Sequence, residues 1–146
     1  MTTIAFDGCT FAADTKSVDT HGLIDTVPKI FHVKNLLVAG AGMYGEILTW
    51  VDWVRSEDGD ILTQKQPHLK RCSCMVVNKL DGKCYRLCGE RLVLCERRFH
   101  AIGSGRDYAL MAMHLGKSAW EAVVLASQFD NDTNDIVVAE NLLAQA

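Results

Sequence analysis

Thr2 stands directly behind the initiator methionine and has the chemistry of a catalytic nucleophile. Its small side chain is of the kind that methionine removal tolerates. The α-amine released by that removal would lie beside its own hydroxyl. Because an α-amine titrates near pH ~7.7–8, it can accept the hydroxyl proton near neutrality. Many proteins begin with Met-Thr, so this interpretation depends on the rest of the sequence.

A lysine between apolar neighbours is the second candidate. We predict a strand from Val27 to Val33, in which Val27, Lys29 and Phe31 point to one face. A lysine in that position is partly desolvated, which lowers its pKa, although a nearby carboxylate keeps it cationic. Asp14, which ends an apolar run, can supply that carboxylate. A structural ion pair between neighbouring strands explains the same two residues, and the local sequence alone favours it.

Two glycines and a serine stand at expected element ends. Gly40 and Gly42 follow the apolar core of a predicted strand, where backbone N–H groups can approach a substrate and form an oxyanion hole. A tight strand-to-helix turn is the alternative. Ser104, between two glycines at a predicted helix start, either hydrogen-bonds a catalytic group or caps the helix.

Metal sites are less well indicated. Four of the six cysteines, Cys72, Cys74, Cys84 and Cys88, offer enough thiolates for zinc, but the usual paired two-residue spacing is absent. Strand alternation favours reduced, buried small side chains instead. The histidines show no paired spacing, and the acidic loop 130–135 lacks the glycine and distal glutamate of a calcium loop. We therefore predict no metal and no cofactor.

The elements that must position these residues follow a simple order of strands, one helix, more strands, two helices and a last strand. Asp7-Gly8 marks a hairpin turn between the first two strands, and Ser118 with Glu121 forms a capping box that starts the last helix. This order predicts an α+β fold with helices on the outer faces of two packed antiparallel sheets. The predicted strands are 2–6, 11–15, 27–33, 36–41, 74–78, 83–88, 92–95 and 136–139, and the predicted helices are 46–55, 108–115 and 118–129.

Composition sets the limits of function. With 146 residues, 49% hydrophobic and 23% charged, the chain is predicted to form one soluble domain, 1–146. A net charge of −3 gives no electrostatic case for a nucleic-acid partner. No apolar run reaches the length of a membrane span, and no basic segment precedes a hydrophobic one at the N-terminus. We therefore expect a cytoplasmic protein without membrane contact.

Taken together, these stretches resemble the proteasome β-subunit and HslV peptidase family of N-terminal-nucleophile (Ntn) hydrolases. No single stretch is specific to this family, but the order and spacing of all of them together are. The stretches cover nearly the whole chain. The matching stretches are 2–5, 12–16, 29–30, 38–42, 101–105 and 130–133.

The resemblance implies a four-layer αββα sandwich and a threonine peptidase. Thr2 matches the nucleophile, with its freed amine as general base, and Asp14 and Lys29 match the charged pair that lowers the pKa of its hydroxyl. The backbone N–H near Gly40 matches the oxyanion donor. The polar residues that orient the terminal amine are matched by Ser104, Asp130 and Thr133.

The resemblance also implies a substrate and partners. Val27, Phe31, Val38 and Met43 would line an apolar specificity pocket, so cleavage of peptides or proteins after hydrophobic residues is expected. A homo-oligomer is expected as well, together with an unfoldase partner of the kind that such peptidases use.

One departure from the family concerns the helices. The family has two long helices between the first and second sheet blocks, and these help to stack one ring on another. Here 56–69 is polar and carries Pro67, so the second helix is shortened or lost, which argues against the usual double ring. Such short versions are similar to proteins that bacteriophages carry. A catalytically silent assembly protein and a small-molecule amidase on the same fold remain the alternatives.

Overall fold

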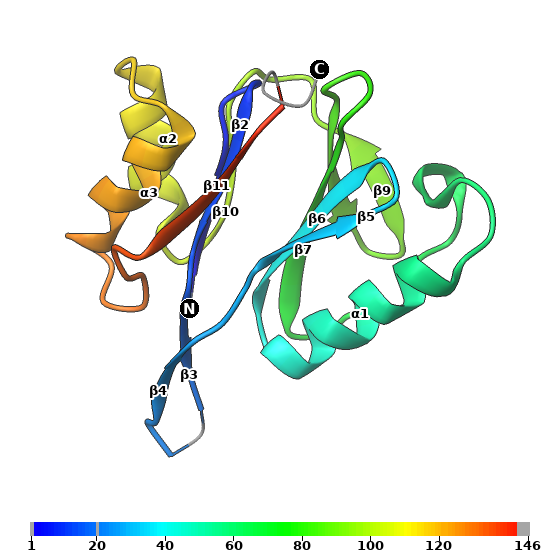
Figure 1. The fold of residues 1–146 in the computed structure, drawn as a ribbon, viewed down its shortest axis with the longest axis horizontal. Helices are drawn as coiled ribbons and strands as arrows, with labels where there is room; N and C mark the ends of the chain where they lie inside the picture. Colours follow the sequence, from blue (N-terminus) through cyan, green and yellow to red (C-terminus); the bar gives the residue numbers. More distant parts are fainter. Residues whose placement is uncertain (1, 20, 143–146) are drawn as a thin grey trace.

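Two antiparallel sheets face one another at the centre of the molecule (Figure 1). The structure is a computed structural model that describes residues 2–19 and 21–142. The first sheet has the order β10-β1-β2-β11, and the second follows chain order from β5 to β9. The first sheet comprises β1 (Thr3–Phe6), β2 (Thr10–Asp14), β10 (His100–Gly103) and β11 (Val137–Asn141). The second comprises β5 (Ile30–Val33), β6 (Leu36–Gly42), β7 (Cys72–Asn78), β8 (Cys84–Cys88) and β9 (Arg91–Leu94).

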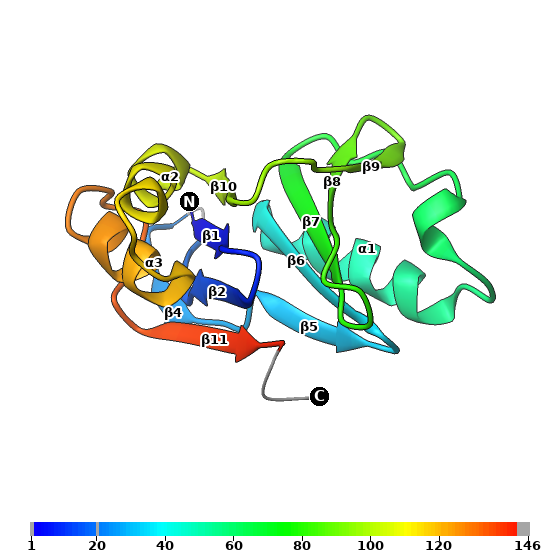
Figure 2. The ribbon, with the colours of Figure 1, turned by 90° about the horizontal axis from the view of Figure 1, so that it is seen from above.

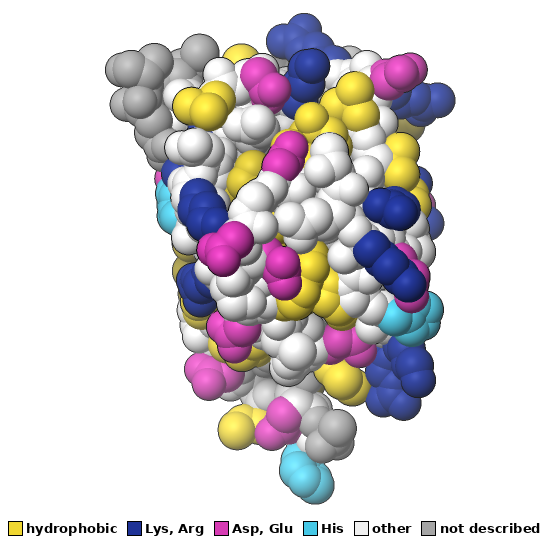
Figure 3. Space-filling view, turned by 90° about the vertical axis from the view of Figure 1, so that its right-hand side faces the viewer, with side chains coloured by type: hydrophobic (Ala, Val, Ile, Leu, Met, Phe, Trp, Pro, Cys, Tyr) yellow, Lys and Arg dark blue, Asp and Glu magenta, His cyan; other side chains and the backbone are white. Residues whose placement is uncertain are grey.

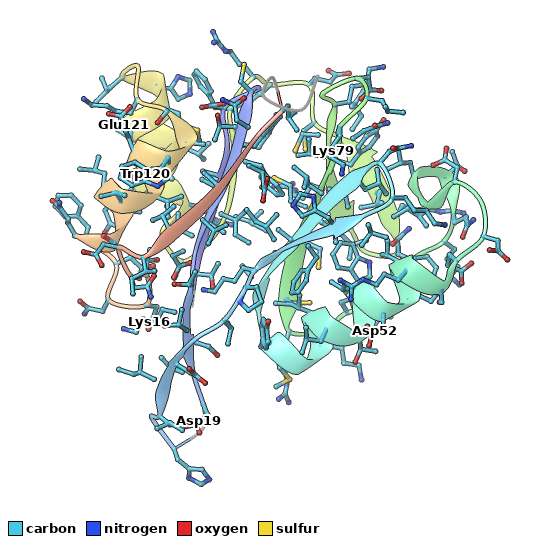
Figure 4. All side chains as sticks on the ribbon, viewed as in Figure 1. Lys16, Asp19, Asp52, Lys79, Trp120 and Glu121 are labelled. Atoms are coloured by element: carbon cyan, nitrogen blue, oxygen red, sulfur yellow. The ribbon has the colours of Figure 1, made fainter. Side chains whose placement is uncertain are left out.

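Helices cover the outer face of each sheet. On the second sheet lies α1 (Tyr44–Ser56), while α2 (Arg106–His114) and α3 (Ala119–Ser127) lie together on the first (Figure 2). The layers therefore run helix, sheet, sheet, helix, which confirms the predicted four-layer αββα sandwich. Trp120 and Glu121 lie on α3, in the outer helical layer (Figure 4).

Each interface between layers has its own apolar cluster. Between the sheets, Phe6 and Phe11 meet edge to face with ring centroids 6.0 Å apart. Trp50, which is fully buried, is the largest side chain between α1 and the second sheet. Small side chains such as Ala109 and Ala122 let α2 and α3 lie close to the first sheet. Strand alternation thus gives each sheet two buried faces.

Local side-chain chemistry sets the ends of several elements as predicted. Asp7 Oδ1 accepts the N–H groups of Cys9 and Thr10 at 2.9 and 2.7 Å, which closes the β1–β2 turn. Ser118 and Glu121 form both hydrogen bonds of the predicted capping box at the start of α3.

Three parts of the chain differ from the sequence prediction. The strand predicted from Val27 begins only at Ile30; Pro28 has no N–H to give to a ladder. The polar stretch after Asp14 forms a hairpin of β3 (Lys16–Val18) and β4 (Ile24–Thr26), which projects from the lower end of the molecule (Figure 1). No strand was predicted just before the helix start at Ser104, but 100–103 form β10, which pairs with β1.

No second α-helix follows α1 before β7, in line with the prediction that such a helix is shortened or lost across 56–69. After α1 the chain forms only a short 3₁₀ turn, η1 (Ile61–Thr63), whose N-cap is the Asp60 side chain. On the face over α1 and this connection, acidic and basic side chains are interspersed among apolar ones (Figure 3). Within residues 2–19 and 21–142, no helix has the length and apolar character of a membrane span.

The cysteines proposed as an alternative zinc set do not converge. Cys72 and Cys74 face α1, whereas Cys84 lies in the cluster between the sheets, on the opposite side of the second sheet. Cys88 is exposed at the end of β8. A tetrahedral zinc site needs four ligands around one point, so the zinc interpretation of these cysteines is wrong.

Candidate active site

Thr2 immediately precedes β1, and its hydroxyl meets a buried ion pair. Lys29 Nζ donates a hydrogen bond to Thr2 Oγ1 and lies 2.9 Å from Asp14 Oδ1. The exposed fractions of the three residues are 2% for Thr2, 5% for Lys29 and 0% for Asp14. A single ammonium group therefore joins the carboxylate at the end of β2 to the hydroxyl at the start of β1.

The Asp14 carboxylate is held by backbone groups as well as by the lysine. Oδ1 accepts the N–H of Thr3 at 3.0 Å, and Oδ2 accepts the N–H groups of Lys16 and Asn134 at 3.2 and 3.3 Å. These donors come from the first residue of β1, the first residue of β3 and the loop before β11. Because both oxygens are fixed, the position of Lys29 is fixed too.

The pKa of Lys29 lies below its usual value of 10.5. Burial is the largest cause, since it removes water from the ammonium; the charge of Asp14 and its hydrogen bond act in the opposite direction. The predicted desolvation of this lysine is confirmed.

Tyr44 fixes the segment that carries Lys29, because its hydroxyl donates a hydrogen bond to the Pro28 carbonyl at 2.8 Å.

A series of hydrogen-bonded polar side chains contacts the backbone of Thr2 from another side. The Thr2 N–H donates to Ser104 Oγ at 3.1 Å, and Ser104 Oγ donates to Asp130 Oδ2 at 2.6 Å. Thr133 Oγ1 also donates to that oxygen at 2.6 Å. Since its one hydrogen is used there, Thr133 accepts the hydroxyl hydrogen of Thr3 across 2.7 Å. The predicted trio of Ser104, Asp130 and Thr133 thus lies together.

Hydrogen bonding decides the charge state of Asp130. Burial is the largest single influence and raises its pKa, but hydrogen bonds from Ser104, Thr133 and the Asp132 N–H together lower that pKa below 3.8. The carboxylate is therefore ionised at neutral pH and faces the nitrogen of Thr2 through Ser104. An anion at this position would stabilise the protonated form of the α-amine that Thr2 would carry after removal of Met1.

Glycines allow the β10–α2 junction to approach Thr2 closely. A Cβ on Gly103, whose φ is +98°, would lie 2.1 Å from the Thr2 carbonyl oxygen. A Cβ on Gly105 would lie 1.9 Å from Thr3 Oγ1. Gly105 is also the N-cap of α2, so the alternative in which Ser104 caps that helix is wrong.

A cavity of about 550 Å³ opens beside Thr2. Val27 and Met43 line it as predicted, but Phe31 and Val38 do not. Those two are paired across β5 and β6 and pack against α1, because that face of the second sheet is covered by the helix. The prediction that they form the pocket is wrong. The cavity is lined by Thr2, Lys16, Ser17, Val18, Asp19, Val27, Lys29, Gly40, Gly42, Met43, Tyr44, Ile47, Arg71 and Asp132.

The last residues of β6, 40–42, border this cavity, and among the described residues no strand pairs with them on the β5 side. Within the described residues, the β5–β6 ladder ends at the pair Ile30 and Ala39, so the chain from Gly40 to Gly42 continues beyond it. Gly40 and Gly42 line the cavity, and a Cβ on Gly40 would lie 2.8 Å from Ile47 Cγ1. Backbone groups on this edge can therefore approach a bound molecule directly.

Sequence reasoning missed several residues of the site. Thr3 and Asn134 contact Asp14 through backbone N–H groups, which every residue except proline has, so their residue types do not indicate this contact. Lys16 donates from Nζ to the Asn131 carbonyl, and Figure 4 shows it at the lower end of the first sheet. Asp19, at the projecting hairpin in the same view, also lines the cavity, and it lies in a polar stretch for which no element was predicted.

Comparison with solved structures agrees on the fold. BPH of Thiobacillus denitrificans matches with a TM-score of 0.71 and 20% identity when in complex with epoxomicin, over 97% of this chain and 98% of that one. A second structure of BPH from Thiobacillus denitrificans gives a TM-score of 0.70 at 20% identity, over 97% of each chain. HslV from Trypanosoma brucei gives 0.66 at 14% identity, over 95% and 97%.

These likenesses establish the class of fold. The chain has the mixed α/β fold of proteasome-like and HslV-like Ntn hydrolases over almost its whole length. A scan against known protein families finds no match, and a search of curated proteins finds none either.

Proposed function

We propose that this protein is an N-terminal threonine hydrolase that cleaves peptide bonds, with Thr2 as the nucleophile after removal of Met1. The observation that carries the proposal is the hydrogen bond from the buried Lys29 ammonium to Thr2 Oγ1, with Asp14 behind it. A cation that is hydrogen-bonded to the hydroxyl stabilises its alkoxide form and so makes it a better nucleophile. The likeness to HslV and BPH supports a peptidase rather than another hydrolase.

The general base is the α-amine that Thr2 gains when Met1 is removed. The nitrogen already faces Ser104, and the ionised Asp130 lies behind that serine. The amine takes the hydroxyl proton as Oγ1 attacks the substrate carbonyl carbon, and it then gives the proton to the leaving amine. An acyl ester on Thr2 remains. Water attacks this ester while the amine accepts one of its protons. The ester C–O bond then breaks, the amine returns the proton to Oγ1, and the carboxylic acid product leaves Thr2 free.

Backbone N–H groups between Gly40 and Gly42 are proposed as the oxyanion donors. This edge of β6 borders the same cavity as Thr2. Donors of this kind stabilise the negative oxygen that forms during attack, and loss of one costs about 10²–10³ in kcat in a well-studied protease. Val27 and Met43 are the apolar residues that would contact the substrate side chain, so we propose cleavage after hydrophobic residues.

The decisive experiment combines N-terminal mass with turnover of a fluorogenic peptide that has a hydrophobic residue before the cleaved bond. Material that lacks Met1 is expected to turn over the peptide, and the rate should rise in proportion to the processed fraction. Thr2→Ala should remove turnover, whereas Thr2→Ser should retain part of it because a hydroxyl remains beside the amine. Activity that survives Thr2→Ala would refute the mechanism.

Two matched serine variants test the contact to the nitrogen of the proposed base. Ser104→Ala removes the contact to the Thr2 nitrogen and is expected to lower kcat by about 10- to 100-fold. Ser127→Ala is the control, because its hydroxyl donates to the Val124 carbonyl on α3, away from the site. Turnover of the control should match that of the unmodified protein.

The remaining alternatives are outcomes of the same assays. Retention of Met1 in all material, with no turnover and no labelling of Thr2 by a peptide vinyl sulfone, would establish a catalytically silent assembly protein. Turnover of simple amides but not of peptides would establish a small-molecule amidase.

We also propose that the protein acts in the cytoplasm as a homo-oligomer that takes peptide or protein substrates, with an unfoldase partner for folded ones. The likeness to HslV and BPH supports this view. Light scattering coupled to size exclusion will give the oligomeric state, and a monomer at micromolar concentration would contradict it.

A further inference from the structure

A second cavity, of about 370 Å³, lies at the other end of the second sheet, beside β10. Its lining includes Cys95 and three basic side chains, those of Arg86, Arg97 and His100, with Glu96 as the acidic member. Thr2 is not among its lining residues, and the proposed peptidase chemistry uses none of these groups.

Cys84 stands directly across from Cys95. The β8–β9 ladder pairs Tyr85 with Leu94, so one further step places the two cysteines opposite each other. The Cys95 N–H donates to the Cys84 carbonyl at 2.8 Å, which continues that pairing. Hydrogen-bonded neighbours in antiparallel strands have Cα atoms ~5.5 Å apart. This separation lies inside the range of roughly 4.4–6.8 Å that disulfides require.

The two thiols have opposite environments. Cys84 is 3% exposed in the cluster between the sheets, whereas Cys95 is half-buried at the edge of that cluster. A hydrogen bond from Cys84 lowers the pKa of Cys95 to about 7, with help from the charge of Arg86 and against the effect of burial. The hydrogen bond to Cys95 and burial raise the pKa of Cys84. One accessible thiolate thus lies beside one protected thiol.

The charges around Cys95 favour an anionic reaction partner. Arg86 comes from β8, and Arg97 comes from the segment between β9 and β10. His100 is mainly neutral at pH 7 because burial lowers its pKa. The two arginines therefore supply the positive charge, and Glu96 offsets one of them.

We propose that Cys95 and Cys84 form a redox site that reacts with an anionic low-molecular-weight disulfide, such as glutathione disulfide, and closes to an intramolecular disulfide. The Cys95 thiolate attacks one sulfur of the small disulfide, whose S–S bond breaks and releases one thiolate. A mixed disulfide remains on Cys95. Cys84 then attacks the Cys95 sulfur, its proton passes to the departing thiolate, and a second small thiol leaves. The two cysteines lose two electrons in total, and the small disulfide gains them.

The closed form would hold β8 to the end of β9 covalently. Its position follows from the existing pairing, so the strands need no change of register. The link would lie at the margin of the apolar cluster between the sheets, where Cys84 already packs.

The test treats the full chain at pH 7 with glutathione disulfide and, separately, with cystamine, a dicationic disulfide. Intact mass and peptide mapping follow the products. We expect a Cys84–Cys95 disulfide as the main product with glutathione disulfide. Cys84→Ser should stop at one glutathione on Cys95, and Cys95→Ser should form neither product.

Exposed cysteines of the same chain provide the controls. Cys88 lines the same cavity, whereas Cys9, on the β1–β2 turn, is not among its lining residues; both are exposed. Cys88→Ser should leave formation of the disulfide unchanged. For Cys95, the rate with glutathione disulfide divided by the rate with cystamine measures the charge preference. This ratio, normalised to the same ratio for Cys9, should fall at least about threefold in Arg86→Gln/Arg97→Gln.

Three results would overturn the proposal. The first is a map in which Cys84 and Cys95 remain reduced while Cys9 or Cys88 is modified. The second is reaction of Cys95 no faster than that of Cys9. The third is a charge preference that the arginine substitutions do not change. The mapping of the unmodified chain requires no substitution, so a variant that fails to fold does not remove the test.

Discussion

Lys29 Nζ lies 2.9 Å from Asp14 Oδ1, and both side chains are almost completely buried. Burial of two charges carries a desolvation penalty that their attraction often only balances, so such a pair is a weak source of stability. Its consequence here is positional, since it holds an ammonium group against the hydroxyl of Thr2.

The two partners of this ion pair should respond differently to removal. Asp14→Ala leaves the Lys29 ammonium buried without its carboxylate and removes the acceptor of three backbone N–H groups. We expect the free energy of unfolding to fall by about 3–5 kcal/mol. Lys29→Met leaves the carboxylate with those three donors, so a smaller loss of about 1–3 kcal/mol is expected.

Urea unfolding followed by tryptophan fluorescence measures both variants. Peptide turnover should be lost in each, because Lys29→Met removes the cation at Thr2 and Asp14→Ala removes the carboxylate that holds this cation in place. Equal losses of stability, or a larger loss for Lys29→Met, would show that the backbone donors do not sustain the carboxylate.

Stability should also depend on pH through Lys29. Its pKa in the folded state is lower than 10.5, so the unfolded chain binds more protons between that lowered value and 10.5. The free energy of unfolding should therefore rise with pH across this window. Below the window both states are protonated and the contribution of Lys29 is constant. The difference between the unmodified protein and Lys29→Met isolates this contribution, and a difference that falls as pH rises would contradict the lowered pKa.

Local chemistry made part of the fold predictable. Asp7 closes the first turn with its own side chain, and Ser118 starts α3 with its capping box; both effects act within a few residues of chain. Strand β10 escaped prediction because it is short and gains its hydrogen bonds from β1, almost a hundred residues earlier in the chain. The β3–β4 hairpin escaped because its sequence is polar and its apolar residues Val18 and Ile24 are exposed.

The candidate site was likewise only partly predictable from the sequence. Residues whose side chains carry charge or a hydroxyl, such as Asp14, Lys29 and Ser104, stood out by type. Phe31 and Val38 were misplaced because alternation shows which residues share a face but not which layer covers that face. The structure places them under α1. Lys29 departs from the predicted alternation because it precedes β5, so its side chain meets Asp14 and not the α1 side.

A glycine pair near the cavity offers a matched test of backbone geometry. Gly42 has φ +124°, and a Cβ there would lie 2.2 Å from the Arg71 carbonyl oxygen. Gly42→Ala should lower the free energy of unfolding by roughly 1–3 kcal/mol and weaken peptide binding, since this residue lines the cavity. Gly45 lies three residues further on in α1, with open space around the same position. Gly45→Ala should raise stability by about 0.4–1 kcal/mol. Thermal unfolding of both variants, with opposite signs expected, checks this account.

The short connection after α1 depends on Gln66, which is 2% exposed. Its Oε1 accepts the indole N–H of Trp50 at 3.1 Å, and its Nε2 donates to the Ile61 carbonyl at 2.8 Å. Gln66→Met keeps the length of the side chain but leaves both buried groups without this partner, which should lower the free energy of unfolding by about 2–4 kcal/mol.

Gln64 provides the control for Gln66. Its side chain is half-buried and makes a longer 3.3 Å contact to the Asp58 carbonyl, so Gln64→Met should change stability by no more than about 0.5 kcal/mol. Urea unfolding measures both variants, and Trp50 fluorescence reports whether the indole has changed its surroundings. If the two substitutions have the same effect, packing of apolar side chains alone holds the connection against α1. A selective loss in Gln66→Met would mean that two hydrogen bonds stabilise this connection, which carries no second α-helix.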